Sequence, residues 1–266
     1  MAGACSHNSF AYQRHVQHDA VVRNCRWIAD KQMLVTSGWD AQIKLWDLRS
    51  QQPAAVITRQ VLGERVHAMD VAFPYLIAGT GDKKVHMFDL QRNPQQPFRS
   101  IPSPLSMQIR CISSMKHQGD VGYVIGSTEG RAAVRFCDAN LDASKSKFSF
   151  KCHRMTQQGA TSGDGPLVFP VHALDWYTHS QFPGCFVTAG GDGSWSVWDK
   201  NSMSRPYEKA ALGLPVTAIK WSPDGSMLAY AMGNDWLKGA QQSLAAQQPT
   251  QVRLHKVTQA TLVSKK

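Results

Sequence analysis

Residues 37–47 read SGWDAQIKLWD, and the same spacing returns in GTGDKKVHMFD at 79–89 and GGDGSWSVWD at 190–199. In each stretch an Asp at a Gly-rich turn is followed six residues later by an aromatic residue and then by another Asp. The pairs are Asp40 and Trp46, Asp82 and Phe88, and Asp192 and Trp198. Each pattern predicts a strand, a tight turn and a second strand that ends in a bulky ring. Recurrence at intervals of roughly 40 to 60 residues is typical of a β-propeller and favours a docking platform over an enzyme.

Short runs rich in Val, Ile, Ala and aromatic residues predict five successive blades in an all-β chain. We expect the blades in residues 18–257, an N-terminal segment in 1–17 and a C-terminal tail in 258–266. The expected strands, blade by blade, are Val21–Trp27, Met33–Ser37, Gln42–Trp46 and Ala54–Ile57; Val66–Val71, Leu76–Thr80 and Val85–Phe88; Arg110–Met115, Gly122–Ser127, Ala132–Cys137 and Phe148–Cys152; Val171–Trp176, Cys185–Ala189 and Ser194–Trp198; and Val216–Trp221, Met227–Ala231 and Gln251–His255.

Several segments fall outside this rhythm. The proline-rich Asn93–Pro104 is interpreted as an extended connector between the second and third blades. Arg154–Pro166 and Gly239–Thr250 are polar and low in complexity, so both are expected to be loops. Five blades make a small ring, and Phe10–Val16 can supply one edge strand but not a further blade.

The repeated residues are interpreted as structural. Asp40, Asp82 and Asp192 suit tight turns because a carboxylate can accept hydrogen bonds from nearby backbone N–H groups. The rings of Trp46, Phe88 and Trp198 are expected to pack against the neighbouring blade. His18 precedes the first inner strand, where a histidine can bond within its blade. The third repeat carries Arg135 where the others have Trp or Phe.

Composition sets limits on function. Lys and Arg number 29 against 19 acidic residues, a net charge of +10, which predicts attraction to acidic protein segments or nucleic acid. No apolar run approaches the roughly 20 residues that span a bilayer, so membrane insertion is not expected. The six cysteines are scattered and form no CxxC pair, which favours buried thiols over a disulfide framework or a metal site.

The sequence predicts no enzyme, no cofactor and no metal. The chain has no GxSxG motif, P-loop or HExxH spacing, and no GxGxxG that follows a strand and opens a helix. Its turn carboxylates are equivalent by repeat, whereas an acid–base pair needs two different environments.

Basic and aromatic residues at blade edges are the candidate site. They are Arg131, Arg154, Trp195, Trp236 and Lys238. If they converge, they form a groove that can grip an acidic peptide or a nucleic acid. Two alternatives stay open: Trp236 is equally consistent with simple packing, and Arg131 with a salt bridge inside its blade.

A series of segments resembles one known family. In order they are SGWDAQIKLWDLRSQQP, GERVHAMDV, SIPSPL, QIRCI, GSTEGRAAV, FSFKCHR, TAGGDGSWSVWDK, DGSMLAYA and NDWLKG. They resemble the WD40-repeat mRNA export factor of the nuclear pore, of the RAE-one or Gle-two type, over roughly residues 17 to 256. The spindle-checkpoint protein of the BUB-three type shares EGR and FKCHR but differs at SIPSPL and at Asp235–Gly239.

The resemblance implies a non-catalytic adaptor for mRNA export. Family members are seven-bladed propellers that bind a short hairpin-forming segment of a Phe-Gly nucleoporin, so two blades of that ring are not found in this sequence. The implied partners are that segment, RNA or messenger ribonucleoprotein, and spindle proteins. The implied location is the nucleus, at the nuclear pore and envelope, with cytoplasmic shuttling. The alternative is a checkpoint scaffold that docks kinases at kinetochores.

Overall fold

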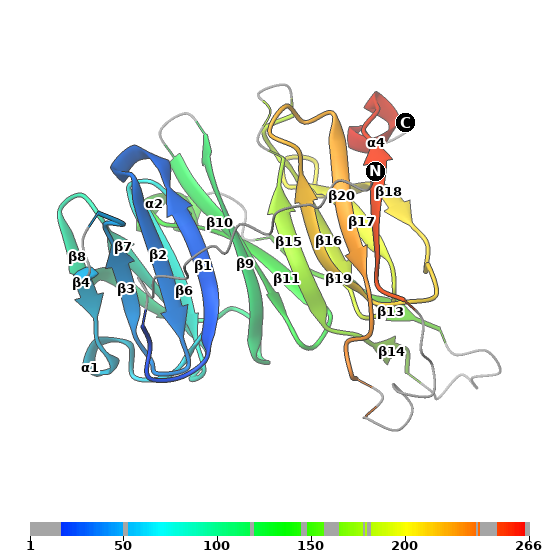
Figure 1. Cartoon of the computed structure of the whole chain (residues 1–266). Helices are drawn as coiled ribbons and strands as arrows, with labels where there is room; N and C mark the ends of the chain where they lie inside the picture. Colours follow the sequence, from blue (N-terminus) through cyan, green and yellow to red (C-terminus); the bar gives the residue numbers. More distant parts are fainter. Residues whose placement is uncertain are drawn as a thin grey trace, which may run out of the picture.

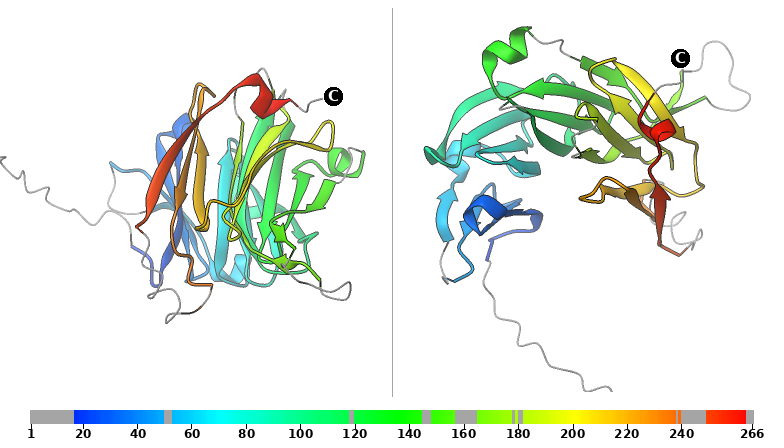
Figure 2. Two further views of the ribbon diagram at one scale, coloured as in Figure 1. Left: turned by 90° about the vertical axis from the view of Figure 1, so that its right-hand side faces the viewer. Right: turned by 90° about the horizontal axis from the view of Figure 1, so that it is seen from above.

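The chain folds as a curved array of small β-sheets (Figure 1). The computed structural model describes residues 17–49, 53–117, 120–144, 148–156, 165–177, 179, 182–237, 239 and 249–263. Within these residues, five antiparallel sheets of three or four strands follow one another in chain order. Seen from above in the right-hand view of Figure 2, they form an arc that does not close into a ring. The prediction of an all-β propeller with five blades is confirmed.

The strands lie close to their expected positions. The first blade contains β1 (Val22–Ile28), β2 (Met33–Gly38), β3 (Ile43–Trp46) and β4 (Pro53–Ile57), and the second contains β5 (Val66–Ala72), β6 (Tyr75–Thr80), β7 (Lys84–Asp89) and β8 (Asn93–Pro102). The third contains β9 (Ile109–His117), β10 (Asp120–Ser127), β11 (Arg131–Phe136) and β12 (Phe148–Lys151), and the fourth contains β15 (Val171–Trp176), β16 (Cys185–Gly190), β17 (Trp195–Asp199) and β18 (Ser204–Lys209). The fifth contains β19 (Val216–Trp221), β20 (Met227–Met232) and β21 (Gln251–Lys256).

A few short elements lie within, between and after the blades. They are the 3-10 turn η1 (Ala29–Lys31), the helices α1 (Arg59–Leu62), α2 (Ala139–Ser144) and α4 (Gln259–Leu262), and the two-stranded sheet of β13 (Arg154–Met155) and β14 (Leu167–Val168). Helix α4 lies in the expected C-terminal tail, and its Leu262 is buried in the core shared by the last two blades.

The apolar core lies between blades. Successive side chains of a strand point to opposite faces of a sheet, so a central strand serves two cores. In β6, Leu76 and Ala78 pack toward the first blade, whereas Ile77 packs toward the third. Two further clusters join the third blade to the fourth and the fourth to the fifth. Each blade is therefore held in place by its neighbours.

The segment Asn93–Pro104 corrects an expectation. Most of it forms β8, the fourth strand of the second blade, with Ile101 opposite Val85 and Arg99 opposite Met87. Prolines are tolerated there because an outer strand needs backbone N–H donors on one side only. Strand β18 is a second outer strand that the polar sequence SRPYEK did not suggest.

The expected loops are only partly described. Arg154–Pro166 begins with β13, which pairs Arg154 with Val168 and Met155 with Leu167, so the loop prediction is wrong at its start. Residues 157–164, most of Gly239–Thr250 and the segment Phe10–Val16 lie outside the described residues. Among the cysteines that the structure describes, Cys137, Cys152 and Cys185 are buried as expected, whereas Cys25 is exposed.

A chain of hydrogen bonds orders the turn in the first and fourth blades. In the first, the Trp46 indole N–H donates to Thr36 Oγ1 at 2.8 Å, and His18 lies 2.7 Å from both Thr36 Oγ1 and Asp40 Oδ2. Since the carboxylate can only accept, His18 Nδ1–H donates to Asp40, and Nε2 bonds to the Thr36 hydroxyl. The expectation that His18 bonds within its blade is confirmed.

The fourth blade repeats this arrangement with Trp198, Thr188, His153 and Asp192. Burial raises the pKa of Asp192, but hydrogen bonds from His153 and Ser194 outweigh burial and leave that pKa below its usual value. The fourth-blade network therefore holds Asp192 ionised in a structural role.

The middle blades use other groups. In the second, Phe88 is buried against the first blade but carries no N–H, and Thr80 bonds to Asp82. In the third, Arg135 donates to both carboxylate oxygens of Asp142 at 2.7 and 2.6 Å, and Arg99 of β8 donates to the same group at 2.9 Å. An ion cluster thus joins the second and third blades where the ring residue is missing.

Replacing the threonine of these hydrogen-bond networks should destabilise the first and fourth blades more than the second. Thr36→Val or Thr188→Val leaves a buried indole N–H and an imidazole nitrogen without a hydrogen-bond partner. The free energy of unfolding should fall by about 2 kcal/mol. Thr80→Val, the matched control, strands no indole and should cost about 1 kcal/mol. Urea unfolding of the three variants measures this order, and three equal losses would contradict it.

Asp142→Asn should destabilise the chain by about 3 kcal/mol at neutral pH, because two half-buried guanidinium groups lose their counter-charge. Burial raises the pKa of Asp142, yet the hydrogen bonds from Arg135, the Phe136 amide and Arg99 lower it to about 2. The stabilisation by the Asp142 carboxylate is therefore complete above its unfolded-state pKa of about 4. It is lost as the pH falls toward the pKa of Asp142 in the folded state. Urea unfolding at pH 7 and pH 3 measures the difference in unfolding free energy between wild type and Asp142→Asn. This difference should be smaller at pH 3, and an equal difference at both pH values would refute the stabilising role of Asp142.

Candidate functional site

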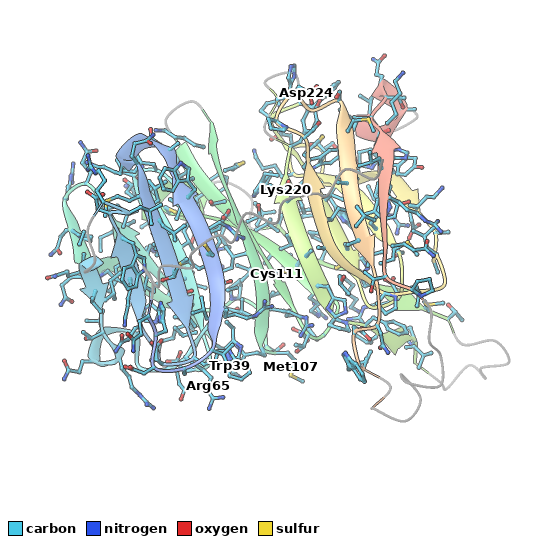
Figure 3. All side chains as sticks on the ribbon, viewed as in Figure 1. Trp39, Arg65, Met107, Cys111, Lys220 and Asp224 are labelled. Carbon is cyan, nitrogen blue, oxygen red and sulfur yellow. The ribbon has the colours of Figure 1, made fainter. Side chains whose placement is uncertain are left out.

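One face of the arc carries the tight turns of the repeats. We call it the turn face: it comprises the turns around Asp40, Asp82, Glu129 and Asp192 and the connections that lead into the inner strands. In Figure 3 it is the lower edge of the molecule, where Trp39, Arg65 and Met107 are labelled. Turns and strand ends form this face, so it can present exposed side chains to solvent.

Arg131 and Arg154 meet at the third blade of the turn face. Arg131 Nε lies 3.7 Å from Glu129 Oε2, and its side chain remains 36% exposed. Arg154 donates from Nη2 to the Glu129 carbonyl oxygen at 3.0 Å, and its Nε is buried without a partner within the described part of the chain. The structure thus brings these two predicted residues together around one acidic residue. Arg131 has both the internal ion pair and the exposure that the sequence left as alternatives.

Trp195 does not belong to this surface. Its side chain is fully buried, stacks on Tyr207 at 5.2 Å between ring centroids and meets the His255 ring edge-on. It forms part of the core between the fourth and fifth blades. The prediction that Trp195 faces a partner is wrong, because the fifth blade packs on the fourth and covers the face of β17 to which Trp195 points.

Trp236 is exposed, as a binding residue must be. Trp236 and Leu237 are each 56% exposed in the turn that follows β20, and Trp236 has a left-handed φ of 60°. Asn234 Oδ1 accepts the Trp236 N–H at 2.9 Å, and Asp235 Oδ1 accepts the Leu237 N–H at 3.1 Å. The packing alternative for Trp236 is not what the structure shows. Lys238 lies outside the described residues.

Contacts connect the arginine pair to this turn. The Phe169 N–H donates to the carbonyl of His153, the residue before Arg154, and the Gly191 N–H donates to the carbonyl of Pro170. A Cβ atom on Gly191 would lie 3.0 Å from Asp235 Oδ2, so the two turns touch. The turn face is therefore continuous from the third blade to the fifth.

Three further residues extend the turn face over the first two blades. Arg65 lies 5.7 Å from the ring centroid of Trp39, which is 44% exposed, and Met107 is 54% exposed (Figure 3). Sequence reasoning missed Trp39, although its place directly before the turn residue Asp40 was a signal for a solvent-facing ring. Aromatic, Met and Arg side chains are enriched at protein interfaces.

The inner strands line the concave side of the open arc, called here the central channel, with a cavity of about 360 Å³. Its charged lining includes Arg23, Arg26, Arg110, Lys220, Asp70 and Asp175. Each carboxylate is engaged: Arg26 and Ser114 donate to Asp70, and Lys220 and the Trp221 N–H donate to Asp175. Burial, and then the charge of Arg23, lower the pKa of Arg110. Burial raises the pKa of the Cys111 thiol to about 12, which disfavours the reactive thiolate form.

The described residues contain no group of three or more His, Cys, Asp or Glu side chains that could hold a metal ion. In the same part of the chain, no helix has the length and apolar character needed to cross a membrane.

The blades and their tight turns define a WD40 propeller. A family model for the WD domain, G-beta repeat, matches residues 10–47. The chain is 37% identical over 242 residues to the mRNA export factor GLE2 of Chaetomium thermophilum, covering 90% of this chain and 63% of that protein. It is 34% identical over 249 residues to the WD40 repeat protein poxJ of Penicillium oxalicum, covering 92% and 68%. It is 36% identical over 250 residues to the poly(A)+ RNA export protein of Schizosaccharomyces pombe, covering 93% and 66%.

The chain belongs to the WD40-repeat family of the Rae1 and GLE2 type, which confirms the resemblance drawn from its motifs. A more distant relative is the mitotic checkpoint protein BUB3.1 of Arabidopsis thaliana, 31% identical over 224 residues that cover 84% of this chain and 63% of that protein. The chain spans about two thirds of the length of these relatives.

Proposed function

We propose that this chain is a non-catalytic adaptor in mRNA export that binds a short segment of a Phe-Gly nucleoporin on its turn face. The observation that carries the proposal is the exposed pair Trp236 and Leu237, on a surface continuous with the Arg131 and Arg154 cluster. Family membership supports the export role, since relatives are named mRNA export factors. The corresponding location is the nucleus, at the nuclear pore, with shuttling to the cytoplasm.

The chemistry of the face suits a peptide with both apolar and acidic residues. Exposed rings and thioethers provide anchors whose burial contributes most of the affinity at an interface. Arg65, Arg131 and Arg154 place positive charge beside those anchors, and the whole chain carries +10. Such charge accelerates encounter with an acidic segment and fixes its register.

RNA is a second partner of the same adaptor in this proposal, bound through phosphates rather than through base recognition. The described charges on the turn face are held by surface side chains, which contact a phosphate backbone without reading its sequence. Binding of spindle proteins would use the same face and compete with the nucleoporin segment.

Trp236→Ala should weaken binding of a synthetic nucleoporin hairpin peptide by at least about 30-fold, because an exposed indole anchor is worth roughly 2 kcal/mol or more at an interface centre. Titration calorimetry measures the affinity. Phe98→Ala removes a comparably exposed ring, 48% accessible, from the outer strand β8 and is the matched control that should bind normally. Equal affinity for the Trp236 variant and wild type would reject this turn as the anchor.

The checkpoint alternative is tested by offering both partner classes. Immobilised chain should recover Phe-Gly nucleoporins from a nuclear extract, and Trp236→Ala should abolish that recovery. Recovery of checkpoint kinases without nucleoporins would overturn the export proposal.

RNA binding should weaken steeply with salt. If Z phosphates are neutralised on a single strand, the logarithm of the association constant falls with the logarithm of salt concentration with a slope of about −0.7 Z. Fluorescence anisotropy with a labelled poly(A) oligonucleotide between low and high salt gives the slope. Affinity independent of salt would rule out phosphate contacts.

A further inference from the structure

A chain of buried hydrogen bonds runs from the central channel to the exposed turn of Trp236. Arg110 of β9 donates from Nε to His172 Nδ1 at 2.8 Å. On its other side, His172 Nε2 lies 2.7 Å from Asp235 Oδ2. The side chains of His172 and Asp235 are only 4% and 7% exposed, so water does not compete for these bonds.

The groups at the two ends of this hydrogen-bonded series fix which atoms donate and which accept. The guanidinium N–H of Arg110 can only donate, so His172 Nδ1 must carry a lone pair. The proton then sits on Nε2 and is donated to the carboxylate of Asp235. Burial, with the charge of Arg110, keeps the pKa of His172 below its usual value, in agreement with this neutral tautomer.

Asp235 also bonds to the backbone of the Trp236–Leu237 turn. Its second oxygen, Oδ1, accepts the Leu237 N–H at 3.1 Å, and the Gly239 N–H donates to the Trp236 carbonyl at 3.0 Å. Trp236 has φ of 60°, a conformation that a bulky residue adopts only when its surroundings hold it there.

The turn also lies close to the backbone of the fourth blade. The position of a Cβ on Gly191 would lie 3.0 Å from Asp235 Oδ2 and 3.3 Å from His172 Nε2. A side chain at residue 191 would therefore press against Asp235 and His172.

We propose that His172 is a positioning residue, which fixes the Trp236–Leu237 turn in its exposed pose by tying Asp235 to Arg110 of the channel wall. The functional part of this inference rests on the proposed nucleoporin binding, since the turn is the anchor there. The positional part does not depend on any partner.

The positional part is tested by hydrogen exchange of the full chain without a partner. His172→Phe keeps a ring but removes both bonds, and the amides of residues 236, 237 and 239 should exchange on the order of tenfold faster, as expected for the loss of a hydrogen bond to a charged group. His172→Gln should restore most of the protection, because its oxygen can accept from Arg110 while its amide donates to Asp235.

Two further variants make the result decisive. Asp235→Asn conserves shape, but it replaces one of the two accepting oxygens with an NH2 group that cannot accept from His172 Nε2–H or the Leu237 N–H. It should therefore behave as His172→Phe even if the phenylalanine variant folds poorly. His86→Gln changes another buried histidine, bonded to Ser100 and Thr80 in the second blade, and should leave the turn unaffected. Unchanged exchange at residues 236–239 in both His172→Phe and Asp235→Asn would overturn the proposal.

Calorimetry with the nucleoporin hairpin peptide then separates the two claims. If both hold, His172→Phe loses roughly tenfold or more in affinity and His172→Gln recovers it. If wild type does not bind the peptide but the exchange contrast is present, the proposed function fails and the positioning role stands. If wild type binds and the exchange contrast is absent, the positioning role fails and the proposed function stands.

Discussion

Each sheet of this chain buries its apolar side chains against the next sheet, and each of the four core clusters draws on two blades. The reason is geometric: a four-stranded sheet is one layer thick and cannot enclose its own apolar faces. Leu76 and Ile77 illustrate this, because two adjacent residues of one strand stabilise two different interfaces. Stability in such an array is close to a sum of nearest-neighbour terms, and the blades at the ends of the arc have one neighbour instead of two.

This layered packing leaves the turns to be ordered by polar contacts. In the first and fourth blades a Trp–Thr–His–Asp chain connects the buried end of a strand to the tight turn. In the third blade the cluster of Arg99, Arg135 and Asp142 fills the place of the missing ring. Different residues thus meet one requirement, which is to pair the polar groups buried at these positions while joining neighbouring strands.

These buried hydrogen-bond networks also hold segments of the turn face in place. His153 belongs to the fourth-blade network, and the next residue, Arg154, reaches Glu129 of the third blade. The channel histidine His172 stands in the same relation to Asp235 and the Trp236 turn. Buried hydrogen bonds therefore fix the segments that carry the exposed side chains. This order reduces the conformational entropy that is lost when a partner binds.

The local pattern determined the blades. Alternating apolar residues and the Asp turns at fixed spacing set the strands within one or two residues, because the two-residue period and the turn chemistry are properties of the chain itself. The proline-rich outer strand β8 was missed because edge strands need few apolar residues and tolerate proline. At the candidate site, Trp195 and Trp236 could not be distinguished from sequence: both are tryptophans beside Gly-rich turns. Only the stacking of the fifth blade on the fourth buries one, while the bond from His172 to Asp235 holds the turn that exposes the other. Burial depends on which blade lies opposite, and that is decided by tertiary packing.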